Sequence, residues 1–503
     1  MIINTEVKDL TRNGAPVLDS YGRCKRLLVV SYVDENGKVQ LFGYPIPEEM
    51  MYQWKYAKKN EVPDSVYKSW DFKPVIKEPI LGNFSEQRIH EMMMDLQRLY
   101  PNDPQIKHFY DLNLPETTFA DIETDVDDLG YSRPEDCRTN INTCSFVKNN
   151  DAFVVGLAKL SPEDIAWIQD EINRHVKSLG VTYTFTYRYH ENEASLLNDI
   201  FNNCIGPADC ISGWNWFGYD WPYLMNMAKK FNIDITWLSK TKTWYDYKPM
   251  MAKGKEDCIR VPMHKGMYDY MEIYKKWDRS VNPKIQNKLD WVAETVLGVK
   301  KVEHKLGFKD LWREDPRLYV FYNAIDSVLI REIDNKIKTS STFFGLGNLM
   351  HIPALTAFSS TKSIEIVQAE YLYRENRVFP KVKKEITEKE EKYEGAFVFE
   401  PIPGIYKGVL CCDYASLYPT SMRQFNISPD TFLFKDKNYV PTKDEIKCVS
   451  GAVYTNKFKG FIPKILDDFY AKRKEYKKKM VVAQKDAYEL EAILERRKKQ
   501  ISV

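Results

Sequence analysis

The sequence of 503 residues has no Cys-x-x-Cys motif, no long apolar run and almost no net charge. Its nine cysteines are scattered, which argues against both a disulfide framework and a structural zinc site. No apolar stretch approaches the roughly 18 residues of a membrane span, and the N-terminus is polar, so we expect a cytoplasmic protein without a membrane partner. The 73 basic and 71 acidic residues exclude a basic coat over the whole surface, although local patches remain possible.

The composition is that of an ordinary folded protein, and the length predicts three to four domains at about 150 residues each. Residues 1–108 contain alternating strand patterns at Arg26–Val33 and Val39–Ile46 and then a helical pattern, which predicts a small α+β unit. Residues 109–339 alternate strand and helix patterns, which is typical of an α/β domain. Punctuation by glycine predicts a further boundary near residue 340.

The C-terminal segment has neither glycine nor proline from Lys464 to Val503, and its apolar residues recur at helical spacing. These apolar residues are Leu466, Phe469, Tyr476, Met480, Ala483, Ala487, Leu490 and Leu494. We expect one long amphipathic helix with Pro463 as its first residue. Its basic run places Arg473 and Lys477 one turn apart on the same side, and a solvated basic face is the alternative interpretation.

A pair of carboxylates is the first chemical signal of the middle block. Thr117–Thr124 has a strand pattern, and residues two apart in a strand project to the same face, so Asp121 and Glu123 lie side by side. Two carboxylates this close favour a hard cation such as Mg²⁺ or Mn²⁺. A strand that ends in an acidic loop is the alternative.

Two more acids follow in the same block. Asp220 lies in the aromatic and glycine-rich segment 212–223, and burying an acid among aromatic rings costs energy unless the acid is paired. Tyr322 and Asp326 are four residues apart in the helical pattern 316–337 and so share one helix face. The alternatives are a core of aromatic residues with Asp220 as a helix cap, and a solvated helix face.

The strand carboxylate pair, the loop aspartate and the helical tyrosine–aspartate pair, in this order, resemble the three exonuclease motifs of the DEDD nucleases. The resemblance implies that Asp121, Glu123, Asp220 and Asp326 hold two divalent ions, Mg²⁺ or Mn²⁺, against the scissile phosphate. It also implies that Tyr322 orients the attacking water. Nearby aromatic residues are candidates for stacking on unpaired bases at a single-stranded DNA 3′ end, although some of them must belong to the core. These residues are Phe119, Trp214, Trp216, Phe217 and Tyr219.

A second chemical signal lies in residues 408–420, where a pattern that predicts a buried apolar strand ends at Asp413 and is followed by Ser-Leu-Tyr-Pro. This string resembles the first catalytic motif of the palm of family B DNA polymerases, and its continuation over 423–430 is most similar to the enzymes of T-even-type phages. The resemblance implies that Asp413 binds the two catalytic metals. It also implies that Leu417 and Tyr418 line the nucleotide pocket. A strand that ends in an ordinary turn is the alternative.

Two further motifs extend this resemblance. Tyr393 and Gly395 match the Tyr-x-Gly-Gly/Ala motif, which implies contact with template DNA. Arg473 and Lys477 match the pair that binds the triphosphate of the incoming dNTP, arginine through its planar fork and lysine as a point charge.

The family resemblance implies a multidomain α/β and α+β fold, with an RNase H-like exonuclease domain on a mixed sheet, the first part of a palm and one long fingers helix. The implied domains are an N-terminal accessory domain (1–108, with 340–380 packing back on it), a 3′–5′ exonuclease domain (109–339), the first part of the palm (381–466) and the first fingers helix (467–503).

The sequence lacks the Tyr-Gly-Asp-Thr-Asp-Ser string that brings the second palm aspartate, the Asn-Ser-x-Tyr-Gly string and the thumb. Two-metal phosphoryl transfer needs carboxylates from two palm strands, and this sequence supplies only Asp413, so we expect no DNA synthesis by it alone. We interpret it as part of a split polymerase completed by a second polypeptide that docks on the apolar helix face around Leu490 and Leu494. A truncated copy is the alternative.

The predicted function is that of a DNA-directed DNA polymerase with 3′–5′ proofreading, acting on primer-template DNA and dNTP, with a sliding clamp reached through the second polypeptide. A stand-alone 3′–5′ DNA exonuclease and a non-enzymatic DNA-binding subunit are the alternatives.

Overall fold

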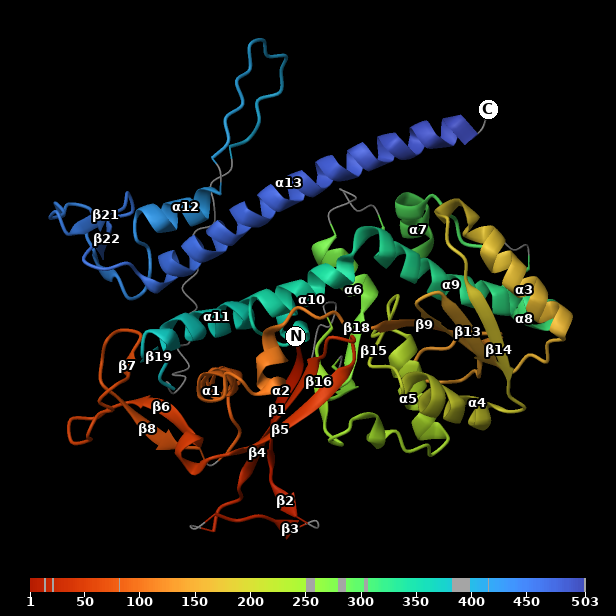
Figure 1. Ribbon diagram of the computed structural model, residues 1–503, viewed down its shortest axis with the longest axis horizontal. Helices are drawn as coiled ribbons and strands as arrows, with labels where there is room; N and C mark the ends of the chain where they lie inside the picture. Colours follow the sequence, from red (N-terminus) through yellow and green to blue (C-terminus); the bar gives the residue numbers. More distant parts are fainter. Residues whose placement is uncertain are drawn as a thin grey trace. The chain divides into compact units, whose positions relative to one another are not determined.

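The computed structural model describes residues 1–503 except 13–14, 20–21, 81, 250–257, 279–285, 303–305, 382–398, 415 and 502–503, and it leaves the side chains of 498–501 undescribed. The chain forms two compact units (Figure 1). The first unit comprises Met1–Met50 and Phe84–Ser363, and the second comprises Met51–Asn83 and Ile364–Val503.

The first unit begins with an antiparallel sheet of β1 (Ile2–Asp9), β4 (Arg26–Val33) and β5 (Val39–Ile46). The bounds of β4 and β5 confirm the two strands expected from the sequence. Helix α1 (Glu86–Leu99) follows, and the side chain of Ser85 caps it by accepting a hydrogen bond from a backbone N–H of its first turn.

A six-stranded mixed sheet forms the centre of the first unit. Its strands, in spatial order, are β14 (Thr184–Tyr189), β13 (Asp151–Gly156), β12 (Ile141–Lys148), β9 (Thr117–Thr124), β15 (Cys210–Gly213) and β18 (Gly266–Asp269). Strand β12 is antiparallel to β9 and β13, whereas β15 is parallel to β9 and β18. Strand β9 therefore lies inside the sheet with a neighbour on each side.

Helices cover both faces of this sheet. Phe119 of β9 belongs to the apolar core shared with α3 (Pro162–His175), α7 (Leu289–Leu297) and α9 (Pro316–Ile337), whereas the next residue, Ala120, belongs to the core shared with α4 (Glu193–Asp199) and α5 (Asp220–Lys230). Because side chains alternate along a strand, Asp121 and Glu123 project to the α9 face. The observed bounds of α9 confirm the predicted helix 316–337.

Among the described residues, the second unit contains two pairs of strands, a three-stranded sheet, most of α11 (Ser360–Arg374) and two further helices that contact each other. The sheet elements are β6 (Tyr52–Tyr56) with β8 (Val75–Pro79), β7 (Lys68–Ser69) with β19 (Arg377–Val378), and β20 (Phe432–Lys435), β22 (Ala452–Thr455) and β21 (Glu445–Lys447). The helices α12 (Leu417–Gln424) and α13 (Phe461–Ile501) are joined by the contact of Arg423 with Asp467. Helix α13 confirms the long C-terminal helix, although it starts two residues before Pro463.

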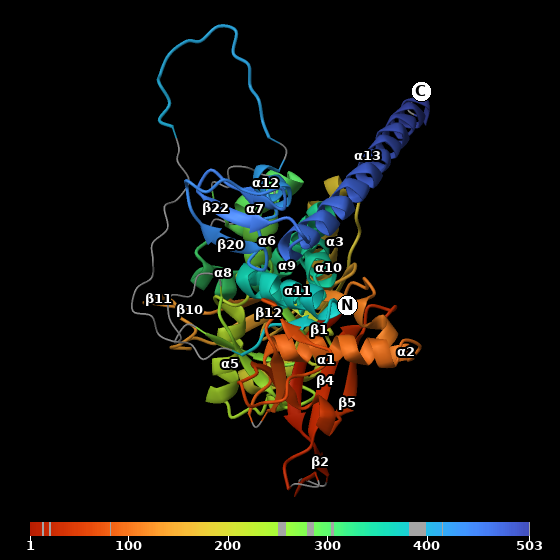
Figure 2. The same ribbon diagram turned by 90° about the vertical axis from the view of Figure 1, so that its left-hand side faces the viewer.

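Residues 408–412 do not form the buried strand that the sequence predicts. They lie in a loop that projects away from α12 in both views (Figures 1 and 2), and Val409 and Leu410 are 74% and 86% exposed. The physical reason is that a strand needs a neighbour to satisfy its backbone groups, and none of the described strands pairs with this segment.

Among the residues that the structure describes, no helix combines the length and the apolar character that crossing a lipid bilayer requires.

Candidate active site

Strand β9 presents Asp121 and Glu123 side by side on the face of the central sheet that α9 covers. The residues between and after them, Ile122 and Thr124, are 4% and 2% exposed, whereas both acids are only partly buried. The alternation expected from the sequence is therefore present, and it brings two carboxylates to one point.

Asp220 reaches this point from the first residue of α5 and is 4% exposed. Strand β15 pairs with β9 only as far as Phe119, and no described strand continues the pairing on that side. The backbone N–H of Ile122 is therefore available, and it donates a hydrogen bond of 3.0 Å to Asp220 Oδ1. The end of the strand pairing thus positions the third carboxylate.

Helix α9 supplies Tyr322 and, one turn later, Asp326, which is 3% exposed. The intervening Asn323 is fully buried and donates from Nδ2 to Asp121 Oδ2 over 2.9 Å. This contact fixes α9 against β9 and orients the carboxylate of Asp121, so that helix and strand contribute to one cluster.

Three of the four acids form a tight group, and Asp220 lies beside them through its hydrogen bond from the Ile122 N–H. One carboxylate oxygen from each of Asp121, Glu123 and Asp326 lies within 4.8 Å of the others. Burial and then the negative charge of Asp326 raise the pKa of Asp121, and burial followed by the charge of Asp121 raises the pKa of Glu123 and of Asp220 well above their usual ranges. Burial also raises the pKa of Asp326. The cluster therefore favours a bound cation.

Lys301 is a member of this site that the sequence analysis missed. Its Nζ contacts Asp326 Oδ2 and lies 3.2 Å from the Tyr322 hydroxyl and 5.1 Å from the centre of that ring. Burial alone would lower the pKa of Lys301, but the negative charges of Asp326 and Asp121 raise it overall. No periodic pattern marks this residue, which lies in a segment without regular structure, so its place follows only from the fold.

The residues present fit a hard divalent ion. All candidate metal ligands are carboxylate oxygens, the ligand type that Mg²⁺ and Mn²⁺ prefer. In addition, Asp326 Oδ1 is buried and accepts no hydrogen bond from any described residue. A buried acceptor without a donor costs free energy unless an ion or water satisfies it. Lys301 neutralises only part of the negative charge, since it is one cation beside four acids.

The aromatic residues expected to stack on bases are mostly part of the core. Phe119 and Trp216 are 0% exposed, Phe217 is 1% exposed and Trp214 is 9% exposed, so the expectation is wrong for these four. They pack against other rings, for example Trp216 on Trp221. Only Tyr219 is partly accessible, and its hydroxyl contacts Thr124 at the end of β9.

The candidate polymerase residues belong to the second unit. Asp413 is exposed in the loop before α12, and Leu417 and Tyr418 in the first turn of that helix are 51% and 70% exposed. Arg473 of α13 donates from Nη1 to Ser416 Oγ over 3.3 Å, which brings the basic run of α13 beside this turn. The metal, nucleotide and triphosphate contacts expected for these residues stay predictions.

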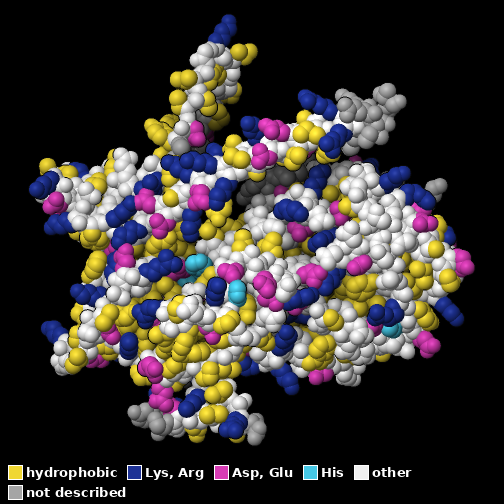
Figure 3. Space-filling model, viewed as in Figure 1, with side chains coloured by type: hydrophobic (Ala, Val, Ile, Leu, Met, Phe, Trp, Pro, Cys, Tyr) yellow, Lys and Arg dark blue, Asp and Glu magenta, His cyan; other side chains and the backbone are white. Residues whose placement is uncertain are grey.

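Lys477 lies one turn after Arg473 on α13 and is exposed. Figure 3 shows Lys and Arg side chains along this helix, as the sequence leads one to expect. Tyr393 and Gly395, the expected contacts to template DNA, lie outside the described residues.

Comparison with known proteins gives a consistent result. The family model for DNA polymerase family B matches residues 352–503. The DNA-directed DNA polymerase of Escherichia phage RB69 is 28% identical over 319 residues, which cover 60% of this chain and 34% of the phage protein.

Two further relatives show similar coverage. The DNA-directed DNA polymerase of Enterobacteria phage T4 is 26% identical over 322 residues (61% of this chain, 35% of the relative). The DNA polymerase of Archaeoglobus fulgidus is 29% identical over 278 residues (54% and 32%). The chain thus spans about a third of the length of the relatives it matches.

Proposed function

Because this chain is related to the family B DNA polymerases and is similar to those of T-even-type phages, we propose that it carries the 3′–5′ proofreading exonuclease and the first part of the palm of such an enzyme. The observation that carries the exonuclease assignment is the convergence of Asp121, Glu123, Asp220 and Asp326 from three separate segments beside Tyr322. The six-stranded mixed sheet crossed by α9 supports an RNase H-like domain. The substrate is the 3′ end of single-stranded DNA.

Each residue of the site has a distinct role in this proposal. The four carboxylates hold two divalent ions, Mg²⁺ or Mn²⁺, which when bound supply an activated water and neutralise charge on the scissile phosphate. Asn323 keeps the Asp121 carboxylate oriented through its 2.9 Å hydrogen bond, and the Ile122 N–H does the same for Asp220.

Tyr322 and Lys301 act on the other side of the cluster. The Tyr322 hydroxyl orients the attacking water, and burial followed by the charge of Asp326 raises the pKa of Tyr322, so the hydroxyl keeps its proton at neutral pH. Lys301 holds both Tyr322 and Asp326 in place through Nζ. It is therefore a positioning residue for the group that contacts water.

The test is digestion of 5′-labelled single-stranded DNA by the full chain. We expect shortening from the 3′ end with Mg²⁺ or Mn²⁺ and none with EDTA. Combining Asp121→Asn with Glu123→Gln should lower the rate by about a thousandfold or more, because the metal ligands are lost. Unchanged activity in this double variant would refute the site assignment.

A matched control removes the same number of negative charges at positions outside the cluster. Glu163 and Asp170 are exposed on α3, so Glu163→Gln with Asp170→Asn removes two negative charges outside the cluster. This variant should digest DNA at the rate of the unmodified chain. Equal losses in both double variants would mean that net charge, rather than the cluster, governs activity.

For the polymerase activity, we propose that Asp413 is the first palm carboxylate, with Leu417 and Tyr418 at the nucleotide and Arg473 and Lys477 at its triphosphate. Because two-metal transfer needs a second palm carboxylate, synthesis requires the remaining palm residues in addition to these 503, on the same or a second polypeptide. The short distance between Arg473 and Ser416 supports this grouping.

Primer extension tests this proposal. This chain supplied with the Tyr-Gly-Asp-Thr-Asp-Ser portion of a related polymerase should extend a primer on template DNA with dNTP, and Asp413→Asn should abolish extension while leaving digestion of single-stranded DNA intact. Digestion without extension by any such combination would favour a stand-alone exonuclease. This alternative has one observation in its favour, namely that the acid cluster is assembled whereas Asp413 lies in an exposed loop.

A further inference from the structure

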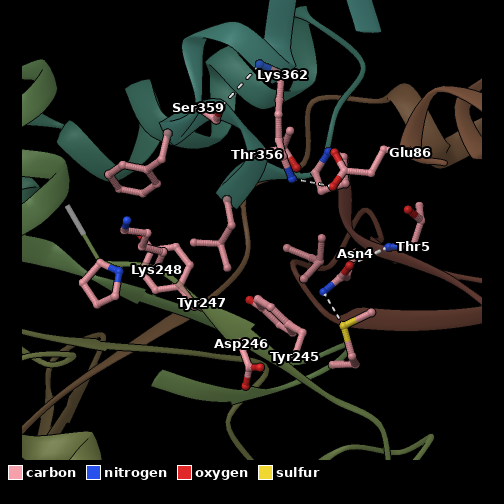
Figure 4. Close-up of a pocket in the computed structure, with 16 residues that line it drawn as sticks. Asn4, Thr5, Glu86, Tyr245, Asp246, Tyr247, Lys248, Thr356, Ser359 and Lys362 are labelled. Carbon is pink, nitrogen blue, oxygen red and sulfur yellow. Dashed lines mark hydrogen bonds and ion pairs between the residues drawn. The ribbon is translucent and has the colours of Figure 1, made fainter. Parts of the chain in front are cut away.

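A cavity of about 680 Å³ lies in the first unit (Figure 4). It is bounded by β1, by the hairpin strand β16 (Trp244–Tyr247) and by the segment before and at the start of α11 (Ser360–Arg374). The described residues that line it include none of the four acids. Its volume is in the range of sites that bind small organic molecules, about 300–1,000 Å³.

Aromatic rings form one corner of this cavity. The rings of Tyr247 and Phe358 are 6.3 Å apart at an angle of 71°. The Tyr247 hydroxyl donates to Glu272 Oε2 over 2.8 Å, which fixes its ring in place. A flat heterocycle can stack on one of these rings and meet the edge of the other, which is the arrangement that aromatic groups prefer.

Tyr245 adds a polar group to the cavity. Figure 4 shows its hydroxyl directed into the interior, and this hydroxyl has no hydrogen-bond partner among the described residues. Burial raises the pKa of Tyr245, so the phenol remains protonated and offers one donor as well as an acceptor. Such a group in a partly buried place favours a ligand with a polar edge.

The rim of the cavity carries charge that a ligand can use. Lys362 Nζ pairs with Glu86 Oε1 over 2.7 Å, and both side chains are about half exposed, so their pairing contributes little stability. Lys248 lies on the rim as well, whereas the side chain of Asp246 turns away from the cavity (Figure 4). An anionic group could therefore replace Glu86 at Lys362 with a small loss.

We propose that this cavity binds one nucleotide unit, with its base against Tyr247 and Phe358, the polar edge of the base at the Tyr245 hydroxyl, and its phosphate at Lys362 and Lys248. The two rings, the Tyr245 hydroxyl and the two lysines of the rim match the base, the polar edge and the phosphate of a nucleotide. The unit is either a free nucleotide or one residue of a single DNA strand, because both carry the same groups. The site is separate from the acid cluster and does not depend on the exonuclease assignment.

The experiment measures binding by calorimetry in EDTA, with the full chain carrying Asp121→Asn and Glu123→Gln so that the acid cluster neither holds metal nor cuts DNA. AMP and an oligonucleotide of eight dA residues are titrated separately. We expect saturable binding of one AMP per chain. Tighter binding of AMP supports a free nucleotide as the natural ligand, and tighter binding of the oligonucleotide supports a DNA strand.

Three variants shift the affinity in different directions. Lys362→Gln should weaken AMP binding about fivefold to tenfold, since a charged contact to phosphate is lost. Glu86→Gln should strengthen it about twofold to fivefold, because Lys362 is released. Tyr245→Phe should weaken it about threefold to tenfold through loss of one hydrogen bond. A folding defect cannot produce an increase in one variant and decreases in the others.

Adenosine, which lacks the phosphate, provides a further readout. Its binding should respond to Tyr245→Phe but to neither Lys362→Gln nor Glu86→Gln, and Lys177→Gln, on the surface elsewhere, should change nothing. The proposal is overturned if neither AMP nor the oligonucleotide binds below about 1 mM. It is equally overturned if AMP binding is the same in all three cavity variants. The digestion assay on the unmodified chain is independent of both results.

Discussion

Replacing Gly213 with alanine should displace the elements that form the candidate active site, although none of its acids is substituted. Gly213 ends β15 where this strand leaves β9, and a Cβ atom added there would lie 2.4 Å from the Ala120 carbonyl oxygen and 2.9 Å from Cε3 of Trp216. Non-bonded contacts are most favourable at roughly 3.5–4.0 Å, so a strand must move by about 1 Å. The nearest atom belongs to the backbone of β9, and no side-chain rotation can relieve the contact.

Overpacking of this kind costs about 1–3 kcal/mol of stability. The displacement would also draw α5 away from β9, and Asp220 would lose its hydrogen bond from the Ile122 N–H. We therefore expect Gly213→Ala to lower the melting temperature of the first unit by several degrees and to reduce digestion of single-stranded DNA about a hundredfold.

The matched control is Gly345→Ala in α10 (Thr339–Leu349), which adds the same methyl group in the same unit. No heavy atom that could obstruct it lies within 4 Å of the added Cβ. Alanine inside a helix is favoured over glycine by about 0.5–1 kcal/mol, so this variant should be slightly more stable and fully active. The reasoning fails if Gly213→Ala is as stable and as active as Gly345→Ala.

The remaining predictions concern charge. Lys301→Met removes the only ammonium group seen at the described acid cluster and should reduce digestion at least about tenfold. It should also raise the Mn²⁺ affinity that calorimetry measures in the absence of DNA, because one cation that competes with the metal is gone. Weaker Mn²⁺ binding by this variant would contradict the prediction. Burial alone would raise the pKa of Glu116, but hydrogen bonds from Lys38, Lys148 and Asn149 lower this pKa to about 2. The ionised Glu116 carboxylate therefore stabilises the fold above about pH 4.5, and this stabilisation is lost as the pH falls towards 2. Glu116→Gln should thus lower the free energy of unfolding by about 1–2 kcal/mol at pH 7 and by much less at pH 3. The prediction is refuted if urea unfolding shows that Glu116→Gln lowers the free energy of unfolding by the same amount at both pH values.

The regular elements of the first unit could be predicted because their patterns are local. The helix 316–337 and the strand Thr117–Thr124 have the predicted bounds, since hydrophobic periodicity and a starting proline define them. The side-by-side arrangement of Asp121 and Glu123 follows directly from the period of a strand. Asp220 required the family resemblance, because nothing local indicates that α5 begins against β9.

Other features depend on contacts between distant segments and could not be predicted. Lys301 reaches Asp326 from a segment without periodicity, so only the folded chain reveals it. Aromatic composition does not distinguish a core ring from an accessible one, so the sequence could not show that Phe119 and Trp216 are among the residues that form the core. The strand expected before Asp413 required a pairing partner, and an apolar run alone does not supply one.

The early end of the pairing between β15 and β9 makes one amide a natural reporter. The Ile122 N–H is held by a side chain rather than by a neighbouring strand, so its hydrogen–deuterium exchange follows the docking of α5 instead of the melting of the sheet. Slow exchange at this single amide would signal an assembled cluster. Fast exchange of this amide, with slow exchange of the neighbouring amides of β9, would identify molecules in which the sheet is intact but Asp220 no longer contacts the Ile122 N–H.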